Sequence, residues 1–243
     1  MGTNETTLVT LATYNELANL PRLVAEIFRY APDVDLLVVD DNSPDGTGRW
    51  CDEEAARDSR VRCIHRAGKL GLGTATVEAM QYAIRHGYTY MLNLDADLSH
   101  PPKYIPELRA GIVQHGVDVM IGSRYVPGGG IEGWPAHRHW MSRAVNFTAR
   151  MLLGLPTRDS SGSFRCYRVE SLQKLDFGAI ISHGYSFLEE VLWRLKRQGC
   201  RFAETPIVFV ERQAGASKIN RAEARRSVGV LLRLGWRNLV GSE

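Results

Sequence analysis

The sequence predicts an α/β protein in which a mostly parallel sheet is flanked by helices. Two observations lead to this prediction. Short apolar runs alternate along the chain with helical patterns, and this rhythm is typical of β-α-β units. The run at residues 36–39 (LLVV) is continuously apolar, as expected for a strand that is covered on both faces.

Strand and helix signals alternate regularly in the first half of the chain. Residues 7–12 (TLVTLA) predict a strand, and a helix is expected at 19–30, where Pro21 lies near the first turn and its missing N–H is tolerated. The further strands that we expect here are 36–39, 61–65, 88–94 and 117–122. The further helices that we expect here are 71–86 and 102–114.

The pattern changes after Arg124. The glycine-rich stretch 127–133 (PGGGIEG) predicts a flexible loop. The elements expected beyond it are helices at 137–153, 185–197 and 221–239 and strands at 164–167 and 202–210. No interdomain linker is visible, so we expect residues 1–243 to form one domain. Its nucleotide-sugar-binding half is expected at about 1–125 and its acceptor half at about 126–243.

Composition indicates a folded protein with a basic end. The 243 residues are 44% hydrophobic and 23% charged, which is ordinary for a globular chain and excludes a disordered one. Although the net charge is only +3, seven basic and two acidic residues lie between Arg212 and Glu243. We therefore expect this segment to face an anionic surface. No signal peptide or membrane span is visible, and the cysteines lack zinc-site spacing, so reduced thiols in the cytoplasm are expected.

Two acids follow the expected strand at 36–39. Ligands of a parallel α/β sheet bind beyond the carboxyl ends of its strands, so Asp40 or Asp41 can accept hydrogen bonds from a ribose or a base. The segment 42–46 (NSPDG) predicts a turn, and a purely structural role for the acids stays open. Glycine-rich GxGxxG and GxxxxGK[ST] phosphate loops are absent from the sequence.

A second acid pair, Asp95 and Asp97, follows the expected strand at 88–94. Residues i and i+2 of an extended chain point to the same side, and two neighbouring carboxylates favour a hard cation such as Mg²⁺ or Mn²⁺. Such an ion can neutralise a diphosphate leaving group. The alternative is a pair of solvated acids at the start of a loop.

Several strings resemble a known family when they are taken in order. ATYNE, VVDDNSPDGT, KLGLGTA, NLDADLSHPP and GSRYVPGGG are similar to family 2 glycosyltransferases with the GT-A, Rossmann-like fold. The later strings DSSGSFRCYR and ERQAGASK, with Trp134, Arg138 and Ser142-Arg143, resemble dolichyl-phosphate or polyprenyl-phosphate mannosyltransferases. The resemblance implies metal-dependent, inverting transfer of mannose from GDP-mannose to a dolichyl or polyprenyl phosphate.

The resemblance also implies roles for individual residues. The nucleotide would be held by Thr13, Tyr14, Glu16, Asp41 and Lys69. Asp95 and Asp97 would bind the diphosphate and Mg²⁺ or Mn²⁺, and Ser99, where some relatives have Gln, leaves the third protein ligand open. The catalytic set would be Asp97, Arg124 and Arg138. Ser142 would hold the lipid phosphate with Arg138, and Arg212 and Lys218 would close over the diphosphate on a mobile loop.

The same resemblance places the protein at a membrane. We expect it to be peripheral on the cytoplasmic face, held by the basic helices at 137–153 and 221–239 or by an integral membrane anchor protein. Docking of these helices onto the protein body is the alternative. A family member that uses another donor such as UDP-glucose, or another acceptor, and an inactive membrane-binding scaffold also stay open. No nucleic-acid partner is expected, since no nucleic-acid-binding motif is present.

Overall fold

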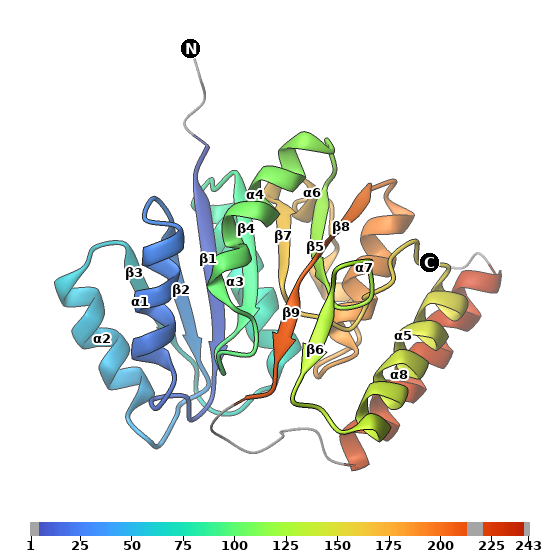
Figure 1. The fold of residues 1–243 in the computed structure, drawn as a ribbon, viewed down its shortest axis with the longest axis horizontal. Coiled ribbons are helices and arrows are strands. Elements are labelled where there is room, and N and C mark those ends of the chain that lie inside the picture. The colour runs from blue at the N-terminus through green and yellow to red at the C-terminus, as the bar shows by residue number, and fades with distance from the viewer. Residues whose placement is uncertain (1–4, 213–220, 241–243) are drawn as a thin grey trace.

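The computed structural model describes residues 5–212 and 221–240. A seven-stranded sheet with the order β3-β2-β1-β4-β7-β5-β8 forms its centre (Figure 1). These strands are β1 (Thr7–Thr13), β2 (Asp35–Asp40), β3 (Val61–His65), β4 (Tyr90–Asp95), β5 (Val119–Ser123), β7 (Arg165–Arg168) and β8 (Phe202–Pro206). All neighbours are parallel except β7, which is antiparallel to β4 and β5. The predicted α/β fold with a mostly parallel sheet is therefore confirmed.

Helices cover both faces of this sheet, as the continuous apolar runs predicted. They are α1 (Leu20–Tyr30), α2 (Thr47–Arg57), α3 (Leu72–Arg85), α4 (Ile105–Gln114), α5 (Ala136–Leu153), α6 (Val169–Leu172), α7 (Phe187–Arg197) and α8 (Arg221–Val240), with single 3-10 turns η1 (Pro102–Tyr104) and η2 (Phe177–Ala179). Alternate residues of β1 separate the two cores, because Val9 packs in the cluster with α1 and α4 whereas Leu8 packs in the cluster with α3 and α7.

Strand register brings the carboxyl ends of β1, β2 and β4 to one edge. Ala12 lies opposite Asp95 on one side, and Thr13 lies opposite Asp40 on the other. The chain turns sharply just beyond each of these strands, where Asn15, Asn42 and Leu98 have left-handed φ angles of 58°, 56° and 63°. Asn tolerates this conformation, but it costs Leu98 steric strain. The strained residue directly follows Asp97, so the backbone at the acid pair is held in an unusual geometry.

One helix was not predicted from the sequence, and two local expectations were wrong. The segment after the Asn-Ser-Pro-Asp-Gly turn is the helix α2, whose start is stabilised because Asp45 accepts hydrogen bonds from the Thr47 amide and hydroxyl. The stretch 127–133, expected to be a flexible loop, contains the short strand β6 (Gly130–Glu132). The single strand expected at 202–210 is divided, since β8 pairs with β5 whereas β9 (Val208–Val210) pairs with β6.

Helices α5 and α8 lie side by side at one end of the sheet (Figure 1). Leu153 of α5 and Leu231 and Leu234 of α8 are buried in the core, so both helices dock onto the protein body. Their outer surfaces carry large apolar side chains, and Trp140, Phe147 and Trp236 are 72%, 65% and 67% exposed. No helix of the described residues is both long and apolar enough to span a membrane. The division into a nucleotide half and an acceptor half stays a prediction.

Candidate active site

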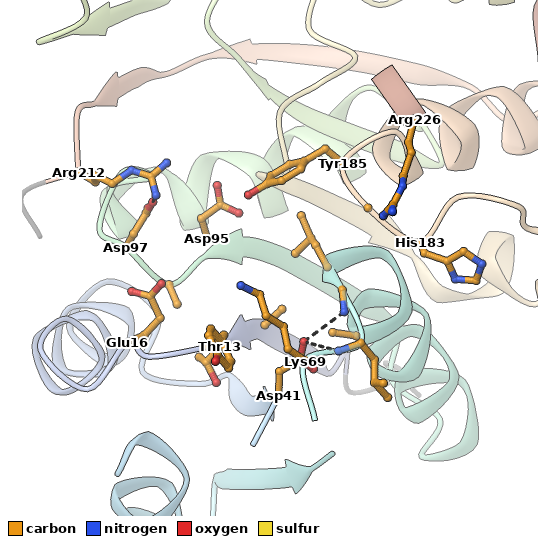
Figure 2. A pocket seen from close by; sticks show the side chains of 18 residues that line it. Thr13, Glu16, Asp41, Lys69, Asp95, Asp97, His183, Tyr185, Arg212 and Arg226 are labelled. Atoms are coloured by element: carbon orange, nitrogen blue, oxygen red, sulfur yellow. Dashed lines mark hydrogen bonds and ion pairs between the residues drawn. The ribbon is translucent and has the colours of Figure 1, made fainter. Parts of the chain in front are cut away.

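A cavity of about 420 Å³ opens at the carboxyl edge of β1, β2 and β4 (Figure 2). Eight of the residues predicted for the site line it: Thr13, Tyr14, Glu16, Asp41, Lys69, Asp95, Asp97 and Arg212. Arg124, Arg138 and Ser142 are not in this lining, and Lys218 lies outside the described residues. The acid pair and the residues expected to hold a nucleotide therefore share one cavity.

Asp41 is engaged by protein groups at one side of this cavity. Its Oδ1 lies 2.6 Å from Nη1 of Arg66, and its Oδ2 accepts from the amides of Leu70 and Gly71 at 3.2 and 3.3 Å. The Arg66–Asp41 ion pair is buried on both sides, with 5% and 7% of the side chains exposed. Asp41 therefore holds the 66–71 loop in place, a task that the strand-end pattern did not predict.

That loop carries Lys69 to the cavity. The Lys69 ammonium lies 4.3 Å from the centre of the Tyr14 ring, so a cation and an aromatic face line the cavity together. Gly71 is required because its φ is 100° and an added Cβ would lie 2.7 Å from the His183 carbonyl oxygen. This close approach, with a hydrogen bond from the Gly73 amide to the His183 carbonyl at 3.0 Å, seats the segment with His183 and Tyr185 against the cavity.

Asp95 and Asp97 are both fixed by neighbouring hydroxyl groups. Ser163 donates to Oδ1 of Asp95 at 2.7 Å, and the Ser99 amide donates to Oδ1 of Asp97 at 3.1 Å. The Ser99 hydroxyl donates to the same Asp97 oxygen. Ser99 therefore supports an acid, and this contact occupies the side chain for which the sequence left a metal-binding role open.

His100 is buried beneath the acid pair. Its Nδ1 accepts from the Asp95 amide at 3.3 Å, and its ring contacts Phe164 and Phe209. Burial lowers the pKa of His100, with Asp95 and Asp97 acting in the opposite direction. His100 is thus a structural side chain that supports the backbone of the acid pair.

Basic residues surround the opposite side of the cavity. Nη1 of Arg212 lies 3.5 Å from Oδ2 of Asp97. Arg226 reaches the cavity from α8, and Tyr185 points toward Asp95 (Figure 2). Sequence reasoning missed Arg226 and Tyr185 as site residues, because a basic helix and a loop tyrosine carry no spacing signal. The cavity thus combines four acids, at 16, 41, 95 and 97, with three cations at 69, 212 and 226.

Arg124 is held by Asp159 next to the acid pair. Nε and Nη2 of Arg124 each lie 2.7 Å from one oxygen of Asp159, whose side chain is 0% exposed, and Ser161 accepts from Nη2 at 2.9 Å. Although burial favours the neutral guanidine, Asp159 raises the pKa of Arg124. Burial opposes ionisation of Asp159 too, but Arg124 holds its pKa below the usual value. The pair is therefore ionised.

Arg138 and Ser142 face this region from α5. Arg138 donates to both oxygens of Glu211 at 2.8 and 2.6 Å, and its guanidinium lies 4.0 Å from the centre of the Trp134 ring. The Arg124 guanidinium lies 5.9 Å from the same ring. Ser142 accepts a hydrogen bond from the Tyr125 hydroxyl at 2.7 Å. Glu211 precedes Arg212, so adjacent residues connect Arg138 to the acid pair.

The donors at the acid pair suit a hard divalent ion. Two carboxylates next to a space for substrate phosphates form the kind of set that Mg²⁺ uses, since this ion keeps waters and takes phosphate oxygens as further ligands. Asp95 is 35% exposed at its side chain, so its carboxylate is accessible from the cavity. The residues present therefore fit the ion that the sequence suggested.

Comparison with known proteins identifies the class of this protein as a glycosyltransferase. Residues 9–176 match the family model described as glycosyl transferase family 2, and the chain belongs to this family. It is 42% identical over 223 residues to polyprenol monophosphomannose synthase of Mycolicibacterium smegmatis, covering 91% of this chain and 84% of that protein. It is 41% identical over 213 residues to undecaprenyl-phosphate mannosyltransferase of Micrococcus luteus, covering 88% and 87%. The predicted glycosyltransferase class is confirmed.

Solved structures support the fold at lower identity. Glucosyl-3-phosphoglycerate synthase from Mycobacterium tuberculosis, in complex with Mn²⁺, UDP and phosphoglyceric acid, has a TM-score of 0.69 at 20% identity, covering 96% of this chain and 79% of that one. The mannosyltransferase PcManGT from Pyrobaculum calidifontis, in complex with GDP-Man and Mn²⁺, has a TM-score of 0.61 at 15% identity, covering 98% and 64%.

Proposed function

We propose that this protein transfers mannose from GDP-mannose to a polyprenyl phosphate, with inversion and with Mg²⁺ or Mn²⁺. The observation that carries the proposal is the single cavity in which Asp95 and Asp97 lie among residues suited to a nucleotide and cations suited to phosphate. Two relatives that are 42% and 41% identical over most of this chain carry the names of polyprenyl-phosphate mannosyltransferases, which supports both mannose and the lipid acceptor.

Asp95 and Asp97 would hold the ion, which supplies charge neutralisation of the departing diphosphate when it is bound. Ser163 and Ser99 keep the two carboxylates oriented. The cations Lys69, Arg212 and Arg226 line the same cavity and would contact the remaining phosphate oxygens. Because these charges are placed before reaction, they stabilise the leaving group without reorganisation.

The acceptor would be a phosphate monoester, whose second pKa of about 6 leaves it largely dianionic at neutral pH. One of its oxygens forms the bond to the anomeric carbon, while the bond from that carbon to the diphosphate breaks and its electron pair leaves with GDP. No proton has to be removed, so the site needs no general base. Arg138 would bind this phosphate, with Ser142 beside it, and Arg124, fixed by Asp159, would contact the sugar and the phosphate.

Helices α5 and α8 would keep the enzyme at the lipid surface. Their outer surfaces combine exposed apolar side chains such as Trp140 and Trp236 with exposed basic residues such as Arg143 and Arg233, the composition of an interfacial helix. The four cysteines are free thiols, which fits a reducing compartment. We therefore place the enzyme on the cytoplasmic face of a membrane, where an integral anchor protein could assist it.

A transfer assay with a short polyprenyl phosphate in detergent tests the proposal. We expect turnover with GDP-mannose that is lost on chelation and restored by Mn²⁺ or Mg²⁺. UDP-glucose is the competing donor, since the fold also occurs in a UDP-binding structure. Preferential use of UDP-glucose would contradict the proposed donor. Undiminished mannose transfer after chelation would contradict the proposed metal dependence.

Arg138→Ala tests the acceptor site separately. We expect the KM for the lipid phosphate to rise at least about tenfold, because a charge-assisted contact of about 1.5–3 kcal/mol is lost, while the affinity for GDP stays unchanged. Arg85→Ala is the matched control, since Arg85 is an exposed arginine on α3 and not on α5 or α8. Equal losses of lipid and GDP binding would show that Arg138 does not belong to the acceptor site.

A further inference from the structure

A second group of metal-ligating side chains lies on the outer edge of the sheet, away from the cavity. Cys63 and His65 are two residues apart on β3, the edge strand, and therefore point to the same side. Asp52 reaches them from α2, which packs against β3. One potential ligand atom from each of the three residues lies within 4.8 Å of the others, and Nε2 of His65 is 2.8 Å from Oδ1 of Asp52.

We propose that Asp52, Cys63 and His65 form a binding site for a borderline divalent metal ion of the Zn²⁺ type. A thiolate, an imidazole nitrogen and a carboxylate are the ligands that tetrahedral Zn²⁺ takes in proteins, and water can supply the fourth position. A thiolate and an imidazole are poor ligands for Mg²⁺ or Mn²⁺, which prefer oxygen. The site therefore selects a different class of ion from the one that the acid pair would hold.

Access and packing both suit this site. The side chains of Asp52 and His65 are 62% and 49% exposed, so an ion can reach them from solvent. The helix approaches the strand closely, because a Cβ at Gly48 would lie 3.1 Å from Nδ1 of His65. The three potential ligand atoms lie within 4.8 Å of one another, near the separations that a tetrahedral ion with bonds of about 2.0–2.3 Å requires.

A bound ion would join α2 to β3 next to Arg66, the residue that forms an ion pair with Asp41 of the cavity. His65 is followed by Arg66, whose guanidinium holds Asp41. None of the three proposed ligands lines the cavity with Asp95 and Asp97. The site is thus structurally separate from the transfer reaction, and its existence does not depend on the proposed function.

Titration of the full chain with Co²⁺ tests the proposal, since sulfur coordination gives a near-ultraviolet charge-transfer band that oxygen ligands do not give. We expect one equivalent of band-forming Co²⁺, displaced by Zn²⁺. Cys63→Ser should abolish the band, whereas Asp97→Asn should leave it. Cys51→Ser is the matched control, because the buried Cys51 thiol is a hydrogen-bond neighbour of Cys63. A band that survives in Cys63→Ser, or that is lost in Cys51→Ser alone, would overturn the assignment.

Zinc affinity gives a second measurement that does not rely on the thiol. His65→Ala and Asp52→Asn should each weaken Zn²⁺ binding by about tenfold or more, since altered supporting groups alone cost 10–100-fold. Circular dichroism of the metal-free variants verifies that they are folded; both positions are exposed, so their folds should be retained. Unchanged affinity in both folded variants would exclude these two ligands.

Discussion

Asp159→Ala removes the partner of a buried cation. In the wild type, the carboxylate of Asp159 accepts from Nε and Nη2 of Arg124 at 2.7 Å each, and from the amides of Arg124 and Gly162 at 3.0 and 3.1 Å. Only 7% of the Arg124 side chain is exposed, so water cannot replace these contacts. Leaving one member of a buried ion pair without its partner costs about 3–5 kcal/mol, a large part of the stability of a typical domain.

Thermal and urea unfolding measure this loss. For a chain of this size, about 3–5 kcal/mol corresponds to a decrease in Tm of roughly 6–20 °C. Asp33→Ala is the matched control, because Asp33 also accepts from two nitrogens of an arginine, Arg109, at 2.8 and 2.7 Å. Since 61% of the Asp33 side chain is exposed, its loss should cost less than about 1 kcal/mol.

A double variant separates the ion pair from general disruption. Replacing Arg124 by Met in the Asp159→Ala background removes the unpaired charge, so the double variant should be more stable than Asp159→Ala alone. Two results would refute this reasoning. Asp159→Ala could destabilise the protein no more than Asp33→Ala does, or the changes in the free energy of unfolding from the substitutions at 124 and 159 could be additive. Either result would show that the pair lacks the energetic role that its burial indicates.

Three further perturbations have defined outcomes. Burial raises the pKa of Glu189 from 4.5 to about 7, so the folded state binds this proton more tightly than the unfolded state does. The resulting contribution to the free energy of unfolding, on the order of 3 kcal/mol, is complete below pH 4.5 and is lost as pH rises to about 7. The free energy of unfolding of Glu189→Gln should not show this decrease with pH. A pH profile of stability identical to that of the wild type would contradict the prediction. Asp97→Ala should abolish metal-dependent transfer while circular dichroism stays unchanged; full metal-dependent activity would exclude the acid-pair site. Trp236→Ser, at a side chain that is 67% exposed, should weaken sedimentation with anionic vesicles by about tenfold, whereas Val113→Ser, on the distant helix α4, should not.

The sequence predicted the fold class and the strand-end acids of the site, because both depend on local patterns. Apolar runs identified the strands, and the acids that follow them had to meet at one edge once the strands were parallel. Asp95 and Asp97, with Asp41, accordingly line one cavity. The resemblance added Thr13, Lys69 and Arg212, which also lie there.

Local patterns were incomplete elsewhere. The sequence predicted the turn at 42–46 but not the helix α2 that follows it, whose first residues Asp45 stabilises. Glycines at 128–130 favoured a loop, but Gly130 begins β6, which is stabilised by pairing with β9. A short strand of this kind depends on a partner far along the chain, and its own residues carry little signal.

Only the tertiary structure decided which distant residues meet. Arg124 and Asp159 are 35 positions apart, and Arg138 and Glu211 are 73 apart, so no spacing rule connects them. The first pair depends on β7, which follows Asp159 and enters the sheet antiparallel between β4 and β5. The second depends on the pairing of β9, just before Glu211, with β6. Apolar periodicity specifies neither arrangement. The sequence by itself determined, to within a residue, where β1, β2 and β4 end, because that follows from local hydrophobicity. The partners of the arginines and the approach of α8 to the cavity follow from the packing of whole elements, because those contacts are made only after the sheet order is fixed.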